Sequence, residues 1–431
     1  MTSIIVSIFL ISMSQYVVTI IIDRHERSFV SYQVLKAWFI LIPVLIIVHL
    51  KFPFIGGHDD QAYYEWSATS LRNINDIFDL TRFSQDAQQP GYLWLLSVVN
   101  FIFGQNLFVY KMINLFFFIV LIPIWYRIGS VLETQEYGNK VAQIFIYLTP
   151  LWFYSFFVLK DMVIVLLQSL FVLGMILNTA ENRIKHWALI IISTILIIPF
   201  RTQLLLINVG VISGASIVLA IKTRQRKKII IMALSAITVY GMLYISTNSD
   251  YMSKFGIYSI YRVIGTQEFV DVLKSNINKM ESNIVAFTIK YFLSETSGLN
   301  VSFYENFTAY TLRGMLAIPW ILLGVPFFVK GLVELFKKNN SLERRTNRLA
   351  STTAFTPAWS IILIYLMGYF FLSLIAGDTT RYRMPDIPVL AIIAVFGWIS
   401  SSAKGRAQIL ELWVISTLSL YSLLKMYEMF T

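Results

Sequence analysis

Cysteine is absent from this chain of 431 residues. Without a thiol, the sequence excludes disulfide frameworks, cysteine nucleophiles, and iron–sulfur or cysteine-ligated zinc sites. Histidine is scarce, at four residues, so a histidine-rich metal centre is not expected. Charge is also low: 14% of the residues are charged, against about 25% in typical soluble domains. The composition therefore argues against an ordinary soluble enzyme.

Apolar residues are in excess instead. The chain is 57% hydrophobic and 15% aromatic, with a mean hydropathy of +0.66. A soluble fold cannot bury that much apolar surface, so we predict an all-α polytopic membrane protein in which 1–431 forms a single transmembrane domain. The net charge of +11 is then expected to lie in cytoplasmic loops, and no nucleic-acid partner is expected.

Apolar runs predict about twelve transmembrane helices, since a crossing needs about 17–25 residues. They lie at 3–22, 34–50, 107–126, 139–157, 162–178, 187–200, 203–221, 229–246, 307–331, 356–376, 388–402 and 407–426. Several of these runs are short. The first run has no basic segment before it and no small-residue cleavage site, so we predict a span there rather than a cleaved signal.

The apolar run 92–104 is too short for a comfortable crossing and follows Pro90, which interrupts a preceding helix. Loop charge decides how it lies. The basic loops are at 24–27, 183–185, 222–228, 337–348 and 404–406. They all fall on one side, in the cytoplasm, if 92–104 does not cross. We therefore predict a surface or re-entrant helix at 92–104, with both termini and the long segments 51–106 and 247–306 outside the cytoplasm.

The first of these outer segments carries adjacent carboxylates in the stretch GGHDDQAYYEW, which contains His58, Asp59, Asp60 and Tyr63. Like charges this close raise the pKa of one carboxyl, which suits a general base. His58 and Tyr63 are predicted substrate contacts. Alternatively, His58, Asp59 and Asp60 bind a divalent cation, but one histidine and one carboxylate pair make a weak metal site. The structural alternative is a solvated loop with a helix-capping aspartate.

Further charges are predicted at the same outer level. Lys160 and Asp161 stand between two spans, where Asp161 alternatively caps the following helix. Arg201 interrupts an apolar run, a costly placement unless it faces water, protein or a ligand. Its alternative role is to snorkel to the interface. Lys111 and Arg313 also lie near outer span ends.

Two arginines, Arg381 and Arg383, lie on the predicted outer side against the positive-inside trend. Arginine binds phosphate bidentately, although lipid headgroups or the nearby Asp378 and Asp386 are alternative partners. Carboxylates and cations at membrane level suit a lipid-linked phosphate and a hydroxyl nucleophile. The cations would stabilise the leaving phosphate, and a carboxylate would accept the proton of the acceptor hydroxyl.

Four stretches carry a resemblance to a known family: GHDDQAYYEWS (57–67), the run 89–114, YSFFVLKD (154–161) and RYRMPDIP (381–388). They resemble the GT-C class of integral-membrane glycosyltransferases, in particular bacterial members related to protein O-mannosyltransferases and lipid A aminoarabinose transferases. The chain departs from that class in an additional span before the aspartate loop and in a single proline, Pro90, where paired prolines are usual.

The resemblance implies two juxtamembrane helices in 51–106, a catalytic base at Asp59 or Asp60, and a second outward aspartate at Asp161. It implies a polyprenyl-phosphate-linked sugar donor, a glycan or lipid-linked acceptor, and inverting transfer in a bacterial inner membrane, with the active site facing outward. The residues then assigned to donor phosphate are Lys160, Arg201, Arg381 and Arg383.

Other functions remain open. The chain also resembles O-antigen and capsule polymerases, in which outward arginines hold a polyprenyl-diphosphate-linked repeat unit. A transporter or flippase is a third hypothesis, although its usual internal repeats and midplane charges are not seen. A binding-only membrane scaffold is the fourth.

Overall fold

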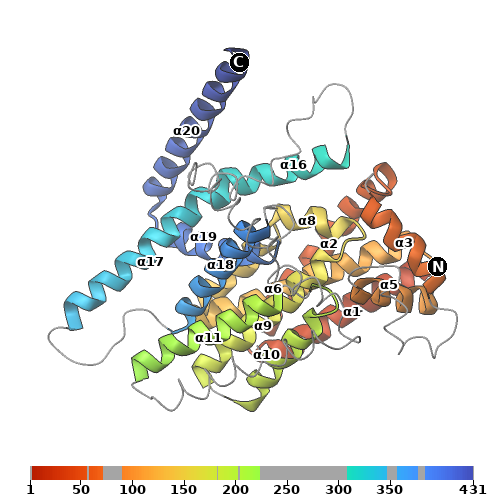
Figure 1. Cartoon of the computed structure of the whole chain (residues 1–431), viewed down its shortest axis with the longest axis horizontal. Helices are drawn as coiled ribbons and strands as arrows, with labels where there is room; N and C mark the ends of the chain where they lie inside the picture. Colours follow the sequence, from red (N-terminus) through yellow and green to blue (C-terminus); the bar gives the residue numbers. More distant parts are fainter. Residues whose placement is uncertain are drawn as a thin grey trace, which may run out of the picture.

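A computed structural model describes residues 2–55, 58–70, 90–181, 183–201, 204–223, 308–346, 357–376 and 384–430. These residues form helices and no strand (Figure 1), which confirms the predicted all-α class. The first helices are α1 (Thr2–Ile21), α2 (Arg27–Lys51), α3 (His58–Ser70), α5 (Pro90–Phe103), α6 (Leu107–Leu132), α7 (Gln135–Phe145), α8 (Thr149–Phe156) and α9 (Asp161–Glu181). The later elements are α10 (Ile184–Ile197), α11 (Leu204–Thr223), α16 (Ala309–Pro319), the π-helix η3 (Trp320–Gly324), α17 (Val325–Thr346), α18 (Pro357–Ala376), the 3₁₀ helix η4 (Met384–Asp386), α19 (Ile387–Ile399) and α20 (Ala403–Phe430).

Several helices suit a bilayer. Among the described residues, five stretches are long and apolar enough to cross a membrane: Thr2–Ile21, Arg27–Lys51, Leu107–Leu132, Asp161–Glu181 and Thr311–Lys337. Shorter apolar helices of 10–17 residues accompany them. The chain is thus a helical membrane protein, but the predicted number of about twelve crossings is not confirmed. The predicted span at 229–246 and the long segment 247–306 lie outside the described residues.

The prediction of one continuous helix at 139–157 is wrong. The structure breaks this run into α7 and α8, with Ile146, Tyr147 and Leu148 between them. Pro150 lies in the first turn of α8. Because proline has no N–H and clashes with the preceding turn, it is accommodated at the start of a helix and not within one.

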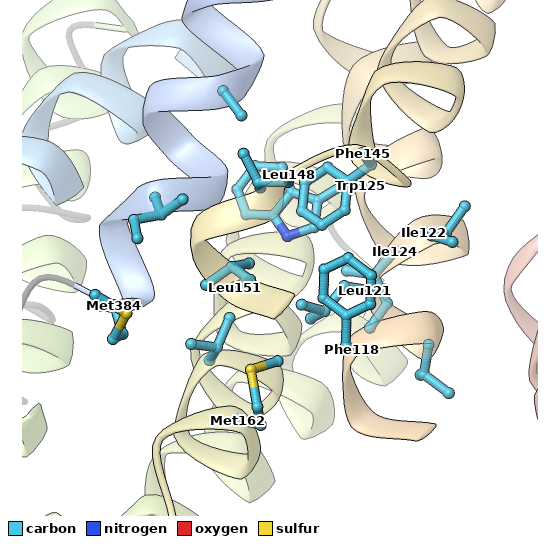
Figure 2. Packing of buried hydrophobic residues seen from close by; sticks show 14 of the residues in the cluster. Phe118, Leu121, Ile122, Ile124, Trp125, Phe145, Leu148, Leu151, Met162 and Met384 are labelled. Carbon is cyan, nitrogen blue, oxygen red and sulfur yellow. The ribbon is translucent and has the colours of Figure 1, made fainter. Parts of the chain in front are cut away.

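α6 is the centre of the bundle. It is buried along most of its length and contacts α1, α2, α7, α8 and α9. Trp125 of α6 stacks on Phe145 of α7, with ring centroids 6.0 Å apart and planes at 11°. Its indole N–H also donates to the Ser169 hydroxyl of α9 at 2.9 Å. Figure 2 shows Phe118 and Trp125 facing Leu148, Leu151 and Met162 across this core. Van der Waals packing of this kind is what holds helices together in lipid.

The helices alternate in direction and create two distinct ends. At the first, called the Asp60 end, Lys111 near the start of α6 donates to the Phe52 carbonyl after α2 at 3.0 Å. At the other, called the Glu133 end, Trp359 near the start of α18 donates to Glu133 after α6 at 2.7 Å. Figure 1 shows α3 and α5 on the right, and the ends of α11 and α17, which lead into or carry the basic loops 222–228 and 337–348, on the left. The described parts of α3 and α5 thus lie at the other end of the bundle from the ends of α11 and α17, and the side of the membrane that each end faces stays a prediction.

Helices α17 and α19 approach so closely that only glycine fits between them. A methyl group at Gly397 of α19 would overlap the Phe327 carbonyl oxygen of α17. We expect Gly397→Ala to lower the free energy of unfolding by about 1–3 kcal/mol, the usual cost of overpacking. Gly210→Ala in α11 is the matched control, because a methyl group there meets nothing within 4 Å. Denaturant titration of the detergent-solubilised chain measures both variants, and equal stability of the two would contradict the close approach.

Candidate functional site

Asp60 lies in the first turn of α3 at the Asp60 end, and its side chain is only 1% exposed. Its carboxylate accepts hydrogen bonds from the backbone N–H of Ile55 at 2.7 Å and of Gln61 at 3.0 Å. Burial raises the pKa of the Asp60 carboxyl above its ordinary value, and the backbone hydrogen bonds and the Lys111 charge offset part of that shift. The residue is therefore a carboxylate with enhanced affinity for a proton.

Lys111 places a positive charge beside this carboxylate. It is fully buried near the start of α6. Its ammonium donates to the Phe52 carbonyl and lies 4.9 Å from the centroid of the Phe157 ring. Charge–ring attraction and the hydrogen bond offset part of the desolvation of the ammonium. Lys111 thus lies near a span end, as predicted, and the outward orientation of that end stays a prediction.

Tyr92 of α5 is influenced by two aspartates of the site. Asp60 and Asp161 both act electrostatically on its hydroxyl, and that hydroxyl donates to Asn114 Oδ1 at 3.2 Å. The ring of Tyr63, a predicted substrate contact, packs edge-on against Tyr92 with centroids 5.1 Å apart. Two of the predicted carboxylates, Asp60 and Asp161, are thus within electrostatic range of one fully buried tyrosine.

Asn114 ties α6 to the chain that leads into α9. Its amide donates to the Phe157 carbonyl at 2.6 Å and to the Leu159 carbonyl at 2.9 Å. On the other side of Tyr92, the N–H of Gly91 donates to the Pro199 carbonyl at 2.9 Å. A side chain at Gly91 would approach Pro199 backbone and side-chain atoms within 2.9 Å. These bonds position the segments that carry Asp161 and Arg201.

Asp161 and Arg201 form a buried ion pair. Arg201 Nη2 lies 3.4 Å from Asp161 Oδ1, with side chains 6% and 1% exposed. Arg201 therefore does not snorkel to water, the alternative that its apolar context allowed. Lys160 precedes Asp161 and is half-buried. The pairing brings two predicted functional residues, 40 positions apart, to one place.

The polar region continues into the bundle through residues that the sequence did not single out as functional. Arg201 and Asp386 both act electrostatically on Tyr369 of α18, and Asp386 of η4 is fully buried. One turn earlier on α18, the Tyr365 hydroxyl donates to Gln168 Oε1 of α9 at 3.2 Å. Tyrosines in apolar runs look like ordinary core residues. In the sequence, this polar region is indicated instead by polar residues inside apolar spans, such as Asn114 and Gln168.

Four predicted site residues are not placed. His58 and Asp59 belong to the first turn of α3, but their side chains lie outside the described part of the chain. Arg381 and Arg383 lie outside it altogether. No group of three or more histidine, aspartate or glutamate residues suited to a metal occurs among the residues described. The possible cation ligands His58, Asp59 and Asp60 therefore stay a prediction.

Chemically, the site combines proton acceptance with anion stabilisation. Asp60 and Asp161 are buried carboxylates, and Lys111 and Arg201 are buried cations. Such groups act strongly on a bound reactant because little water screens them. A scan against models of known protein families and a search of curated protein sequences both found no match to this chain.

Proposed function

We propose that this chain is an inverting membrane glycosyltransferase that uses a polyprenyl-phosphate-linked sugar. One observation carries the proposal: the buried carboxylates Asp60 and Asp161 both act electrostatically on Tyr92, while Lys111 acts on Asp60 and Arg201 pairs with Asp161, at one end of an apolar helix bundle. A lipid-linked phosphate needs cations at membrane level, and a hydroxyl acceptor needs a base.

In the proposed reaction, Asp59 or Asp60 accepts the proton of the acceptor hydroxyl. The oxygen then attacks the anomeric carbon of the donor sugar, and the bond from that carbon to the phosphate oxygen breaks. Polyprenyl phosphate leaves with the bonding electron pair, and the anomeric configuration inverts. The phosphate is stabilised by Lys160 and Arg201, and by Arg381 and Arg383 from the segment that follows α18 in the sequence. Asp161 orients Arg201 through their ion pair.

The basic loops support the orientation of this reaction. Positively charged loops favour the cytoplasm, and those at 222–228 and 337–348 adjoin or lie at helix ends remote from α3 and α5 (Figure 1). The Asp60 end then faces outward from a bacterial inner membrane. A donor and a glycan or lipid-linked acceptor on that face belong to the synthesis of cell-surface polysaccharide or glycolipid.

A polysaccharide polymerase is the second candidate, because the buried Arg201 would equally hold a polyprenyl diphosphate. Analysis of lipid-linked and surface glycans in a deletion strain separates the two. We expect each repeat to lack one sugar in the deletion strain, and the wild-type gene to restore it. Glycans that end after one complete repeat would instead identify a polymerase, and unchanged glycans would contradict both functions.

A further inference from the structure

Two adjoining cavities lie away from the proposed catalytic site. One is apolar, has a volume of about 470 Å³, and is lined by residues that include Tyr147, Leu148, Trp320, Leu323 and Ala394. The other is polar, has a volume of about 480 Å³, and lies at the Glu133 end. Both volumes are within the range of small-molecule sites, about 300–1,000 Å³. Ile144 and Trp398 line both cavities, so the two are neighbours.

The polar cavity carries charges of both signs. Glu133, Glu136, Lys140 and Arg406 line it. Arg406 lies over the Trp398 ring, 4.8 Å from its centroid. Because Trp398 lines both cavities, this guanidinium lies near the boundary between them. Two carboxylates and two cations match a headgroup that itself has one negative and one positive charge.

The sequence of α7 leads from one cavity to the other. Glu136, Lys140 and Ile144 are spaced four residues apart and so lie along one face of the helix. The first two line the polar cavity, and Ile144 lines both. This face therefore changes from charged to apolar toward the interior of the bundle, as an amphiphile does along its length.

The apolar cavity arises where two helices are irregular. The break between α7 and α8 contributes Tyr147 and Leu148, and the π-helix η3 contributes Trp320 and Leu323. π-Helical turns are rare and are frequent at functional sites. Within the described part of the chain, the Trp320 indole N–H is buried without an acceptor.

We propose that these cavities bind one zwitterionic glycerophospholipid with a primary-amine headgroup. Its phosphate pairs with Lys140 and Arg406, its ammonium lies beside Glu133 and Glu136, and one acyl chain enters the apolar cavity. The site lies at the end of the bundle opposite Asp60, so it is separate from the proposed donor site and does not depend on the proposed function.

Native mass spectrometry of the detergent-purified full chain tests the site, with dioleoylphosphatidylethanolamine as the probe. We expect one bound lipid per chain, and an affinity about tenfold lower in Lys140→Gln and in Arg406→Gln. Lys404→Gln is the matched control, because it removes a positive charge at the same end without lining either cavity. Ala394→Phe, which fills the apolar cavity, is expected to prevent binding.

Two further lipids test the headgroup. Dioleoylglycerol lacks the phosphate and the amine, and dioleoylphosphatidylglycerol lacks the amine, so both are expected to bind more weakly than the probe. Glu136→Gln is expected to weaken the preference for the ethanolamine lipid over the glycerol lipid. Equal binding of all three lipids, or wild-type affinity in both charge variants, would overturn the proposal even where Ala394→Phe fails to fold.

Discussion

Asp60→Asn is expected to reduce sugar transfer by about 10²–10⁴-fold, the usual contribution of a general base. The amide keeps the shape of the side chain and retains one of the two backbone hydrogen bonds from Ile55 and Gln61, which reach different oxygens, but it cannot accept the proton of the acceptor hydroxyl. The measurement is transfer from a polyprenyl-phosphate sugar by membranes that contain equal amounts of each variant.

Two variants on the same helix complete that experiment. Asp59→Asn tests the neighbouring carboxylate, which is the alternative base. Glu65→Gln is the control, because Glu65 is an exposed carboxylate on α3 that accepts only from the Gln61 side-chain amide among the bonds described. Full activity in both Asp59→Asn and Asp60→Asn would remove the first-loop carboxylates from the mechanism.

The pH profile separates a base from a structural aspartate. Burial raises the pKa of Asp60, and a base works only when ionised. The rate should therefore fall as the pH decreases through that raised pKa, at a higher pH than for an exposed aspartate. Lys111 holds the pKa of Asp60 down, so Lys111→Met should move the acid limb to higher pH. An unmoved limb would show that Asp60 is not the base.

Arg201→Gln is expected to lower the free energy of unfolding by about 3–5 kcal/mol, because it leaves the Asp161 carboxylate buried without its counter-charge. The pair is 6% and 1% exposed, so water cannot replace the missing guanidinium. The double variant Asp161→Asn, Arg201→Gln should lose less than the sum of the two single variants, since removing both charges avoids an uncompensated one. Denaturant unfolding in mild detergent measures all three.

The chain contains a matched surface pair for that cycle. Arg183 and Glu181 are 2.9 Å apart but 60% and 41% exposed. Solvent screens such a pair, so Arg183→Gln should change stability by about 1 kcal/mol or less. A loss in Arg201→Gln no larger than that in Arg183→Gln, or strict additivity in the double variant, would show that the buried pair does not hold α9 against the segment after α10.

The sequence predicts a helix most reliably where a residue or a run length allows only one structural interpretation. Pro90 and the shortness of the run 92–104 predict a helix that does not span the bilayer. The structure has α5 at Pro90–Phe103, about 21 Å of helix against an apolar thickness of about 30 Å. The single span predicted at 139–157 is two helices in the structure, because Pro150 starts a new helix within the apolar run. Apolar content cannot distinguish one crossing helix from two short ones.

For the site, the sequence identified Asp60, Asp161 and Arg201 but not the groups that connect them. Charged residues in apolar runs are conspicuous because each is costly to bury. Tyr92 and Tyr369 are not, since tyrosine is common in apolar cores, and their role depends on neighbours from other helices. In the sequence, Asp386 is a neighbour of the two arginines, whereas in the structure it is fully buried and acts electrostatically on Tyr369.

By itself, the sequence determined that this is a helical membrane protein and which rare charges lie within apolar context. Those properties follow from the transfer energy of side chains, which is local to each segment. Only the tertiary structure decided that Asp161 pairs with Arg201, that Asp60 and Asp161 both act on Tyr92, and that a charged cavity lies next to an apolar one. These depend on how helices distant in sequence pack, and packing is set by the shapes of all the contacting side chains together.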